Sequence, residues 1–190
     1  MRVIAGQWKG RRLLGPSGKD VRPTTDRVKE AMFNLLARTV SGSMVLDVCC
    51  GSGGLGIEAL SRGAEHAVFI DVSRASLGLT RRNLENCGAD RSRWTLVSRD
   101  ALTYLQSGVI LGEQGPLLLL CDPPYGSPVA DACLGLGAEL LRRTGFRGAV
   151  VEMGARAGAV AAGNAPWEFR RYGRTRLAIL RPKGQGVTHD

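Results

Sequence analysis

Residues 47–56, Asp-Val-Cys-Cys-Gly-Ser-Gly-Gly-Leu-Gly, limit the architecture of this chain more than any other stretch. Gly51, Gly53 and Gly56 have the spacing G-x-G-x-x-G, and Asp71 follows twenty residues after Gly51. A glycine-rich turn between a strand and a helix, with an acid about twenty residues later, is typical of α/β domains that bind a nucleotide. The alternative is a turn whose glycines only allow the helix to pack closely on the sheet.

Short apolar runs alternate with helical patterns from residue 43 onward. This alternation predicts βαβ units and therefore a parallel sheet with helices on both faces. Only a few residues around Gly173 join the last two runs, so that pair must be antiparallel. The expected strands are Met44–Val48, His66–Ile70, Trp94–Ser98, Leu117–Cys121, Ala149–Glu152, Glu168–Tyr172 and Arg176–Leu180. The expected helices are Gly54–Arg62, Ser73–Cys87, Ala101–Gln106 and Ala130–Arg143.

The N-terminal part of the chain has a different pattern. Residues Arg2–Leu14 contain two short apolar runs around a glycine turn, which favour a hairpin. Thr24 or Thr25 can then cap a helix whose apolar residues recur at helical spacing, namely Val28, Met32, Leu35 and Leu36. We therefore expect a basic extension of hairpin and helix over residues 1–40 and the α/β domain over residues 41–190.

The positive charge of the chain is concentrated at its two ends. The sequence has 26 Lys and Arg against 17 Asp and Glu, a net charge of +9. Residues 1–30 carry +5, residues 168–190 carry +4, and the residues between them sum to zero. This distribution favours a polyanionic partner such as a nucleic acid. A merely solubilising charge is the alternative.

The composition disfavours several classes of protein. The five cysteines are odd in number and lack C-x-x-C spacing, and there are two histidines, so we expect no disulfide framework, no metal site and no Ser-His-Asp triad. Reduced cysteines favour a cytoplasmic protein. No apolar run reaches the roughly 18–20 residues of a membrane span, and the first residues lack the apolar core of a signal peptide.

Acids at the predicted strand ends distinguish between two nucleotide cofactors. Asp47 stands at the entrance of the glycine turn, where its charge would repel the pyrophosphate of a dinucleotide. S-adenosylmethionine carries an ammonium and a sulfonium instead, and a carboxylate favours both. Asp71 can accept hydrogen bonds from ribose hydroxyls of either cofactor. Asp100, which can also cap a helix that starts at Ala101, can meet the adenine edge with its side chain or neighbouring backbone.

The motif Asp122-Pro123-Pro124-Tyr125 directly follows a strand. Its two prolines fix two φ angles and remove two N–H donors, leaving carbonyls that can only accept hydrogen bonds. Asp122 and the Pro123 carbonyl would hold both hydrogens of an exocyclic amine, and Tyr125 would stack on the base. The motif therefore predicts methyl transfer to an aromatic amine, with Asp122 taking the proton. A turn without chemical function is the alternative.

These motifs together resemble a known family. Asp122–Tyr125 resembles the amino-methyltransferase signature of class I S-adenosylmethionine-dependent enzymes. With R-P-T-T-D-R-V-K-E-A-M-F-N from residue 22 and G-L-G-I-E-A-L-S-R-G-A from residue 54, the pattern is similar to the bacterial 16S rRNA guanine-N2 methyltransferases of the RsmD type. The resemblance covers nearly the whole chain. It implies methylation of one guanine of 16S rRNA, in a partly assembled 30S subunit, by a protein that we expect to be a monomer.

The resemblance also implies a fold and a set of site residues. The fold is the Rossmann-like class I fold, with a seven-stranded, mostly parallel sheet and a C-terminal antiparallel hairpin. Cys49 and Cys50 stand where the family has an aromatic and a small residue, and Asp71 stands where Glu is more usual; we expect the cysteines to repack the loop rather than react. The implied catalytic loop is Asp122–Tyr125. The resemblance implies Asp47, Gly51, Ser52, Gly53 and Asp71 as cofactor-binding residues, and we add Cys49, Asp100 and Ala101 as further candidates.

Arginines at both ends of the chain are candidates for RNA contact. If Glu168–Tyr172 runs parallel to the central strands, the turn that follows it lies at the same edge of the sheet as Asp122. The resemblance implies that residues 22–27 also lie near the cofactor, so both charged ends would meet on one face. The alternative is that these arginines are solvated charges that discourage edge pairing. The candidate RNA-binding residues are Arg11, Arg12, Arg22, Arg27, Arg170, Arg171, Arg174 and Arg176.

Three other functions stay open from the residues alone. The nearest is an adenine-N6 or cytosine-N4 methyltransferase of DNA or RNA, since Asp-Pro-Pro-Tyr serves those amines as well. A nicotinamide-dependent oxidoreductase is disfavoured by Asp47 and leaves the Asp-Pro-Pro-Tyr motif unexplained. A non-catalytic RNA-binding assembly factor that has kept the fold is the alternative from another class.

Overall fold

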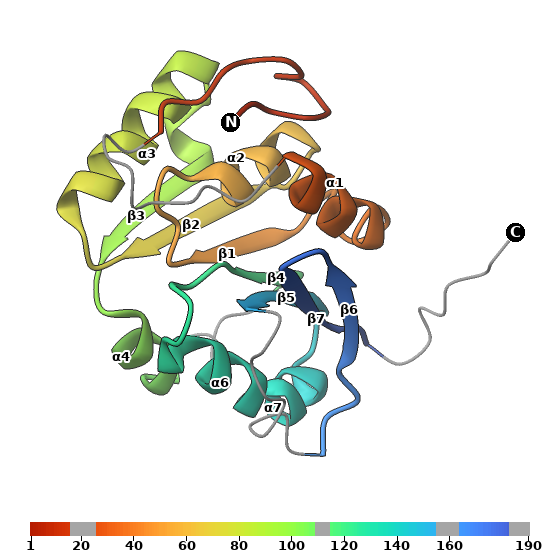
Figure 1. The fold of residues 1–190 in the computed structure, drawn as a ribbon. Helices are drawn as coiled ribbons and strands as arrows, with labels where there is room; N and C mark the ends of the chain where they lie inside the picture. Colours follow the sequence, from red (N-terminus) through yellow and green to blue (C-terminus); the bar gives the residue numbers. More distant parts are fainter. Residues whose placement is uncertain (16–25, 109–114, 155–163, 183–190) are drawn as a thin grey trace, which may run out of the picture.

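The computed structural model describes residues 1–15, 26–108, 115–154 and 164–182. Its centre is a seven-stranded sheet with the order β3-β2-β1-β4-β5-β7-β6 (Figure 1). Strands β1 to β5 pair in parallel, whereas β7 lies antiparallel between β5 and β6. The strands are β1 Met44–Val48, β2 His66–Asp71, β3 Trp94–Ser98, β4 Leu117–Cys121, β5 Phe146–Gly154, β6 Glu168–Tyr172 and β7 Thr175–Leu180. The predicted mostly parallel sheet with an antiparallel C-terminal pair is thereby confirmed.

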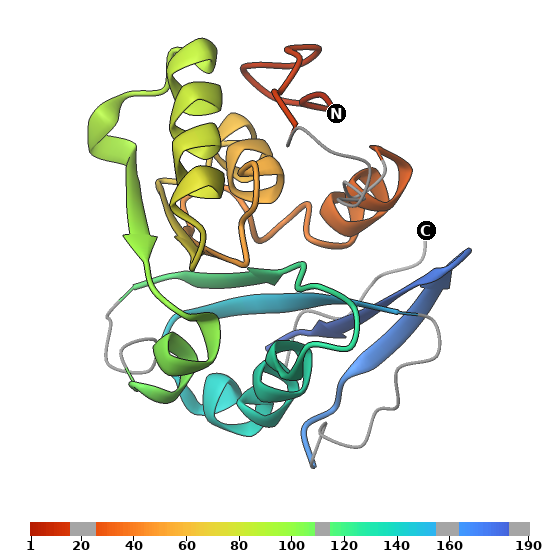
Figure 2. The ribbon, with the colours of Figure 1, turned by 60° about the vertical axis from the view of Figure 1, so that its left-hand side comes forward.

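Helices cover both faces of the sheet. Figures 1 and 2 show α1, α2 and α3 on one face and α4, α6 and α7 on the other. Strands β1 and β4 are buried on both sides: Leu118 and Leu120 belong to the core on the α1–α3 side, and Leu117 and Leu119 to the core on the other side. This two-sided burial explains why these strands read as continuous apolar runs. The helices are α1 Asp26–Leu35, α2 Gly54–Ser61, α3 Arg74–Cys87, α4 Ala101–Gln106, α6 Pro128–Gly135 and α7 Gly137–Arg142, with a short 3₁₀ helix at Arg91–Arg93. Within the described residues, none of the helices is long and apolar enough to cross a membrane.

Two predicted elements differ from the structure. The expected helix Ala130–Arg143 is divided into α6 and α7. At the division the Trp167 indole N–H donates to the Leu134 carbonyl over 3.1 Å, and a Cβ on Gly137 would come within 2.5 Å of the same indole nitrogen. Strand β5 extends beyond the expected Ala149–Glu152 at both ends, because its pairing with β4 and β7 continues past the apolar stretch.

The N-terminal residues fold back on themselves as expected, although residues 1–15 form a single antiparallel bridge, Arg2 to Arg12, rather than regular strands. Trp8 and Leu13 belong to the same hydrophobic core as α1 and the α2 face of the sheet. The division of the chain at residue 40 stays a prediction.

A buried ion pair between α1 and α2 also holds this N-terminal segment in place. The Lys29 ammonium of α1 lies 3.3 Å from the Glu58 carboxylate of α2, and both side chains are fully buried. Glu58 also accepts hydrogen bonds from the backbone N–H groups of Ile4 and Ala5 at 2.7 and 3.0 Å and from Arg62 at 2.7 Å. Burial lowers the pKa of Lys29, and the neighbouring Glu58 carboxylate opposes that shift. One carboxylate thus joins α1, α2 and the first residues of the chain.

Removal of the Glu58 carboxylate should destabilise the protein strongly. In Glu58→Ala the Lys29 charge stays buried without its counter-charge, so we expect a loss of about 3–5 kcal/mol in the free energy of unfolding. The measurement is urea unfolding, with the exposed Glu65→Ala as a control that should change stability by less than about 0.5 kcal/mol. Equal stabilities of the two variants would contradict this role of Glu58.

Candidate active site

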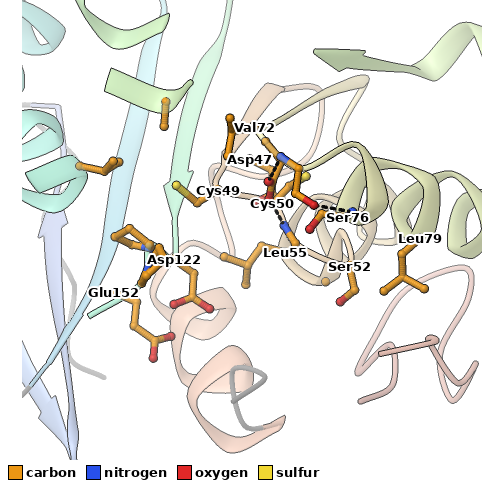
Figure 3. Close-up of a pocket in the computed structure, with 18 of the residues that line it drawn as sticks. Asp47, Cys49, Cys50, Ser52, Leu55, Val72, Ser76, Leu79, Asp122 and Glu152 are labelled. Atoms are coloured by element: carbon orange, nitrogen blue, oxygen red, sulfur yellow. Dashed lines mark hydrogen bonds between the residues drawn. The ribbon is translucent and has the colours of Figure 1, made fainter. Parts of the chain in front are cut away.

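The carboxyl ends of the central strands border a cavity of about 1040 Å³. In an open α/β sheet this is the edge at which ligands bind. Figure 3 shows Asp47, Asp122 and Glu152 at the ends of neighbouring strands, with Ser76 and Leu79 of α3 across the cavity. The structure brings most of the predicted site residues to its lining: Asp47, Cys49, Gly51, Ser52, Asp71, Asp100, Ala101 and Asp122–Tyr125.

The glycine turn adopts the backbone that its sequence requires. Gly51 and Gly53 have φ angles of 55° and 80°, in the left-handed region that glycine tolerates best, and Gly53 is the N-cap of α2. Gly53 lies directly before α2 but does not itself line the cavity. A Cβ on Gly56 would come within 2.3 Å of the Phe69 ring, so Gly56 serves the close packing of helix and sheet. Gly51, which lines the cavity, therefore fits the ligand-binding interpretation of the motif, and Gly56 fits the packing interpretation.

Asp47 is a buried acid that orders this turn. Its Oδ2 accepts a hydrogen bond of 2.8 Å from the Gly56 N–H, and its residue is only 1% exposed. Loss of hydration raises the pKa of Asp47 well above its ordinary value, the bond from Gly56 opposes this shift, and the carboxylates of Asp122 and Asp71 add to it. A cation at the cavity would reverse the effect, because it favours the ionised carboxylate.

The other two predicted cofactor acids are placed by short hydrogen bonds. Asp71, at the end of β2, accepts from the N–H groups of Gly51 at 2.9 Å and Ser73 at 2.8 Å. Asp100 is the N-cap of α4 and accepts from the Thr103 N–H at 2.9 Å, a bond that lowers the pKa of Asp100. Asp100 thus caps a helix and also lines the cavity, so both interpretations of this residue fit the structure.

The two cysteines of the turn have different surroundings. Cys49 lines the cavity and has a φ angle of 60°, a left-handed conformation that non-glycine residues seldom adopt. Cys50 is buried, and burial raises the pKa of its thiol, which keeps the thiol protonated. Its position fits the expectation that it packs the loop. All five cysteines of the chain are free thiols in the structure.

The Asp-Pro-Pro-Tyr motif forms one wall of the cavity. Asp122 is half-buried, Pro123 is buried, and the Tyr125 residue is 51% exposed. The Tyr125 hydroxyl lies 3.3 Å from Glu152 Oε1 and 3.2 Å from Thr175 Oγ1, which fixes one end of the ring. A Cβ on Gly154 would lie 3.7 Å from the ring, so the ring rests on this backbone. The motif therefore presents an anchored aromatic ring next to a carboxylate.

Sequence reasoning did not assign a role to two residues of this wall, Glu152 and Thr175, which both line the cavity. Glu152 had a recognisable signal, because it is an acid at the end of the apolar run Ala149–Val151, as Asp122 is an acid after the run of β4. Thr175 had none, because its position follows from the pairing of β7 with Gly154 of β5.

The C-terminal arginines lie near the same edge of the sheet. Strand β6 runs parallel to the central strands, since it and β5 are both antiparallel to β7. Arg171 and Arg174 are exposed at or beside the β6–β7 turn. Two others have partners in the hairpin: Arg170 pairs with Glu168, and the Arg176 guanidinium lies 4.2 Å from the centre of the Phe169 ring.

The N-terminal arginines have separate surroundings. Arg11 donates to the Asn86 carbonyl in the last turn of α3. Arg82, one turn earlier in the same helix, lines the cavity, and Asn83 donates to the Ser52 carbonyl of the glycine turn. That both charged ends of the chain meet on one face stays a prediction. Arg12 and Arg27 are exposed, and Arg22 lies outside the described residues.

Metal ligands are not gathered in the described ranges: no group of three or more His, Cys, Asp or Glu side chains there could hold a metal ion. The site is thus defined by carboxylates, an aromatic ring and a glycine turn.

Comparison with known proteins places these features in a family. The family model described as "Conserved hypothetical protein 95" matches residues 1–180. The Bacillus subtilis protein named "Putative rRNA methyltransferase YlbH" is 38% identical over 148 residues, which are 77% of this chain and 79% of that protein. The "Ribosomal RNA small subunit methyltransferase D" of Escherichia coli is 37% identical over 137 residues, 72% of this chain and 66% of that protein.

Solved structures agree with this relationship. The structure described as "Putative methyltransferase yhhF from Escherichia coli" has a TM-score of 0.72 and 30% identity, and the match covers 97% of this chain and 99% of that chain. A more distant structure, described as "a putative methyltransferase complexed with SAH", has a TM-score of 0.62 at 12% identity, covers 79% of this chain and 48% of that chain, and shares the fold alone. The chain has the fold of the S-adenosylmethionine-dependent methyltransferases, and it belongs to the RsmD family, described as conserved hypothetical protein 95.

Proposed function

We propose that this protein transfers a methyl group from S-adenosylmethionine to the exocyclic N2 amine of one guanine in 16S rRNA, in an assembling 30S subunit. The observation that carries the proposal is the Asp122–Tyr125 wall beside an acid-lined cavity, in a chain whose relatives are named small-subunit rRNA methyltransferases. The cytoplasm, where ribosomes assemble, is the proposed location, and a monomer is the proposed state.

The cavity fits this cofactor better than a dinucleotide. Its glycine turn is flanked by the carboxylates of Asp47 and Asp71, which suit a cation and ribose hydroxyls but not a pyrophosphate. Gly51 leaves open space where a Cβ would lie, and Asp100 with Ala101 borders the cavity on the α4 side. When bound, S-adenosylmethionine supplies an electrophilic methyl group, whose bond to sulfur breaks as N2 bonds to the carbon.

The chain's own groups orient the amine and remove its proton. An aromatic amine is a poor nucleophile because its lone pair is delocalised into the ring. Asp122 and the Pro123 carbonyl can accept its two hydrogens and aim the lone pair, and the Tyr125 ring can stack on the base. As positive charge develops on N2, the Asp122 carboxylate stabilises that charge and takes the proton.

The decisive experiment is methylation of 30S particles from cells that lack the gene, with labelled S-adenosylmethionine and mapping of the modified base. We expect label on N2 of one guanine of 16S rRNA. Asp122→Asn keeps an acceptor but is a far weaker proton acceptor, so it should lower kcat by about 10²–10⁴-fold while S-adenosylmethionine still binds. Label in DNA, or none in rRNA, would refute the proposal.

A second prediction concerns the ionisation of Asp47. Because folding raises the pKa of this carboxyl, its contribution to stability is fully present below the unfolded value of 3.8 and is lost as the pH rises through the folded value. Asp47→Asn cannot ionise and keeps an acceptor for Gly56. The stability of the free wild-type protein should therefore fall relative to Asp47→Asn as the pH rises above about 4, as measured by urea unfolding.

The same substitution, which favours the stability of the free protein, should weaken its binding of the cofactor. If the ionised Asp47 faces a cationic cofactor, Asp47→Asn should bind S-adenosylmethionine about 10- to 100-fold more weakly in calorimetry at pH 7.5. The wild-type affinity should rise with pH more steeply than that of the variant. Equal affinities at every pH would remove Asp47 from the cofactor site.

Another prediction concerns the arginines of the β6–β7 turn. Arg171→Gln with Arg174→Gln should weaken RNA binding and reduce the slope of log K against log salt by about 1.5, because two phosphate contacts are lost. S-adenosylmethionine affinity should be unchanged. The matched control is Arg38→Gln with Arg142→Gln, two exposed arginines that precede β1 and β5 at the opposite edge. An equal change in slope for both double variants would show that the turn is not an RNA contact.

A further inference from the structure

Glu152 lies next to the catalytic loop on the neighbouring strand. The last paired residues of β4 and β5 are Cys121 and Val151, so Asp122 and Glu152 occupy equivalent positions one residue further along two parallel strands. Side chains in such positions point to the same face of the sheet. Figure 3 shows both carboxylates at this edge, and both residues line the cavity.

The surroundings of Glu152 hold its carboxylate in place. The residue is only 4% exposed. The hydroxyls of Tyr125 and Thr175 both lie 3.3 Å from Oε1, and Tyr125 also belongs to the proposed base-stacking surface. Burial of an acid costs free energy, and this cost favours a role for Glu152 in recognition.

We propose that Glu152 determines the choice of guanine by accepting a hydrogen bond from N1–H of the target base. This inference rests on the proposed function, in which N2 lies at Asp122. In guanine the N1–H donor is the immediate neighbour of the N2 amine on the Watson–Crick edge. The other ring neighbour of the N2 amine is the N3 lone pair, which a carboxylate would repel. With N2 held at Asp122, the base would therefore be oriented with N1–H toward Glu152.

The same carboxylate disfavours the other bases that an Asp-Pro-Pro-Tyr loop could methylate. Beside its exocyclic amine, adenine presents the N1 lone pair and cytosine the N3 lone pair, both acceptors. A carboxylate facing such a lone pair gains no hydrogen bond and loses hydration, so binding is penalised. Asp122 and Pro123 recognise an amine of any kind, whereas Glu152 would recognise the ring nitrogen next to it.

The test pairs a change in the enzyme with a change in the base. 30S particles are reconstituted with 16S rRNA that carries either guanine or 2-aminopurine at the mapped position. 2-Aminopurine keeps the N2 amine but has a lone pair at N1. Wild-type enzyme should prefer guanine by about 10- to 100-fold in kcat/KM. In Glu152→Gln, whose amide can donate to N1, this preference should collapse or reverse. The loss of O6 in 2-aminopurine affects both enzymes and cancels in the comparison.

The matched control is Tyr125→Phe, which removes a hydroxyl from the same carboxylate. This variant should slow methylation of both bases and keep the wild-type preference for guanine. If Glu152→Gln behaves in the same way, Glu152 only positions Tyr125 and the inference is wrong. If wild-type enzyme does not distinguish the two bases, the inference also fails, even if Glu152→Gln does not fold. Absence of label from guanine with wild-type enzyme would instead refute the proposed function, and this inference with it.

Discussion

The hydrogen bond from the Gly56 N–H to Asp47 joins the end of β1 to the first turn of α2. It requires a helix that lies very close to the sheet, and only glycine at position 56 leaves room for the Phe69 ring there. With β1 and α2 joined in this way, the turn between them borders the cavity and does not fill it. The Gly51 N–H can then donate to Asp71 of β2, and both residues line the cavity.

Much of this arrangement could be predicted because the chemistry follows the strand ends. The order of apolar runs and acids predicts Asp47, Asp71 and Asp122 at one edge of the sheet, and the short link at Gly173 predicts that β6 and β7 are antiparallel, as they are. Residues within one βα unit are close in sequence, so local sequence patterns predict where these residues lie.

Contacts between distant segments were the part that could not be predicted. The division between α6 and α7 depends on Trp167, about thirty residues later in the chain. Thr175 reaches the site through strand pairing, and Arg11 donates to the carbonyl of Asn86 in α3, 75 residues later in the chain. No local signal encodes such contacts. Glu152 is an intermediate case, since the pattern that identified the other acids also applies to it.

The buried Glu58 carboxylate has a consequence for the order in which the chain can fold. Residues 1–15 are synthesised before their distant partners: Ile4 and Ala5 bind Glu58, and Leu14 pairs with Asn83 of α3. Docking of this segment closes loops of 53 to 69 residues, and such non-local contacts form late. Residues 1–15 are therefore synthesised before the segments that hold them but dock after those segments have folded, and until then the apolar surface that receives Trp8 stays open to water.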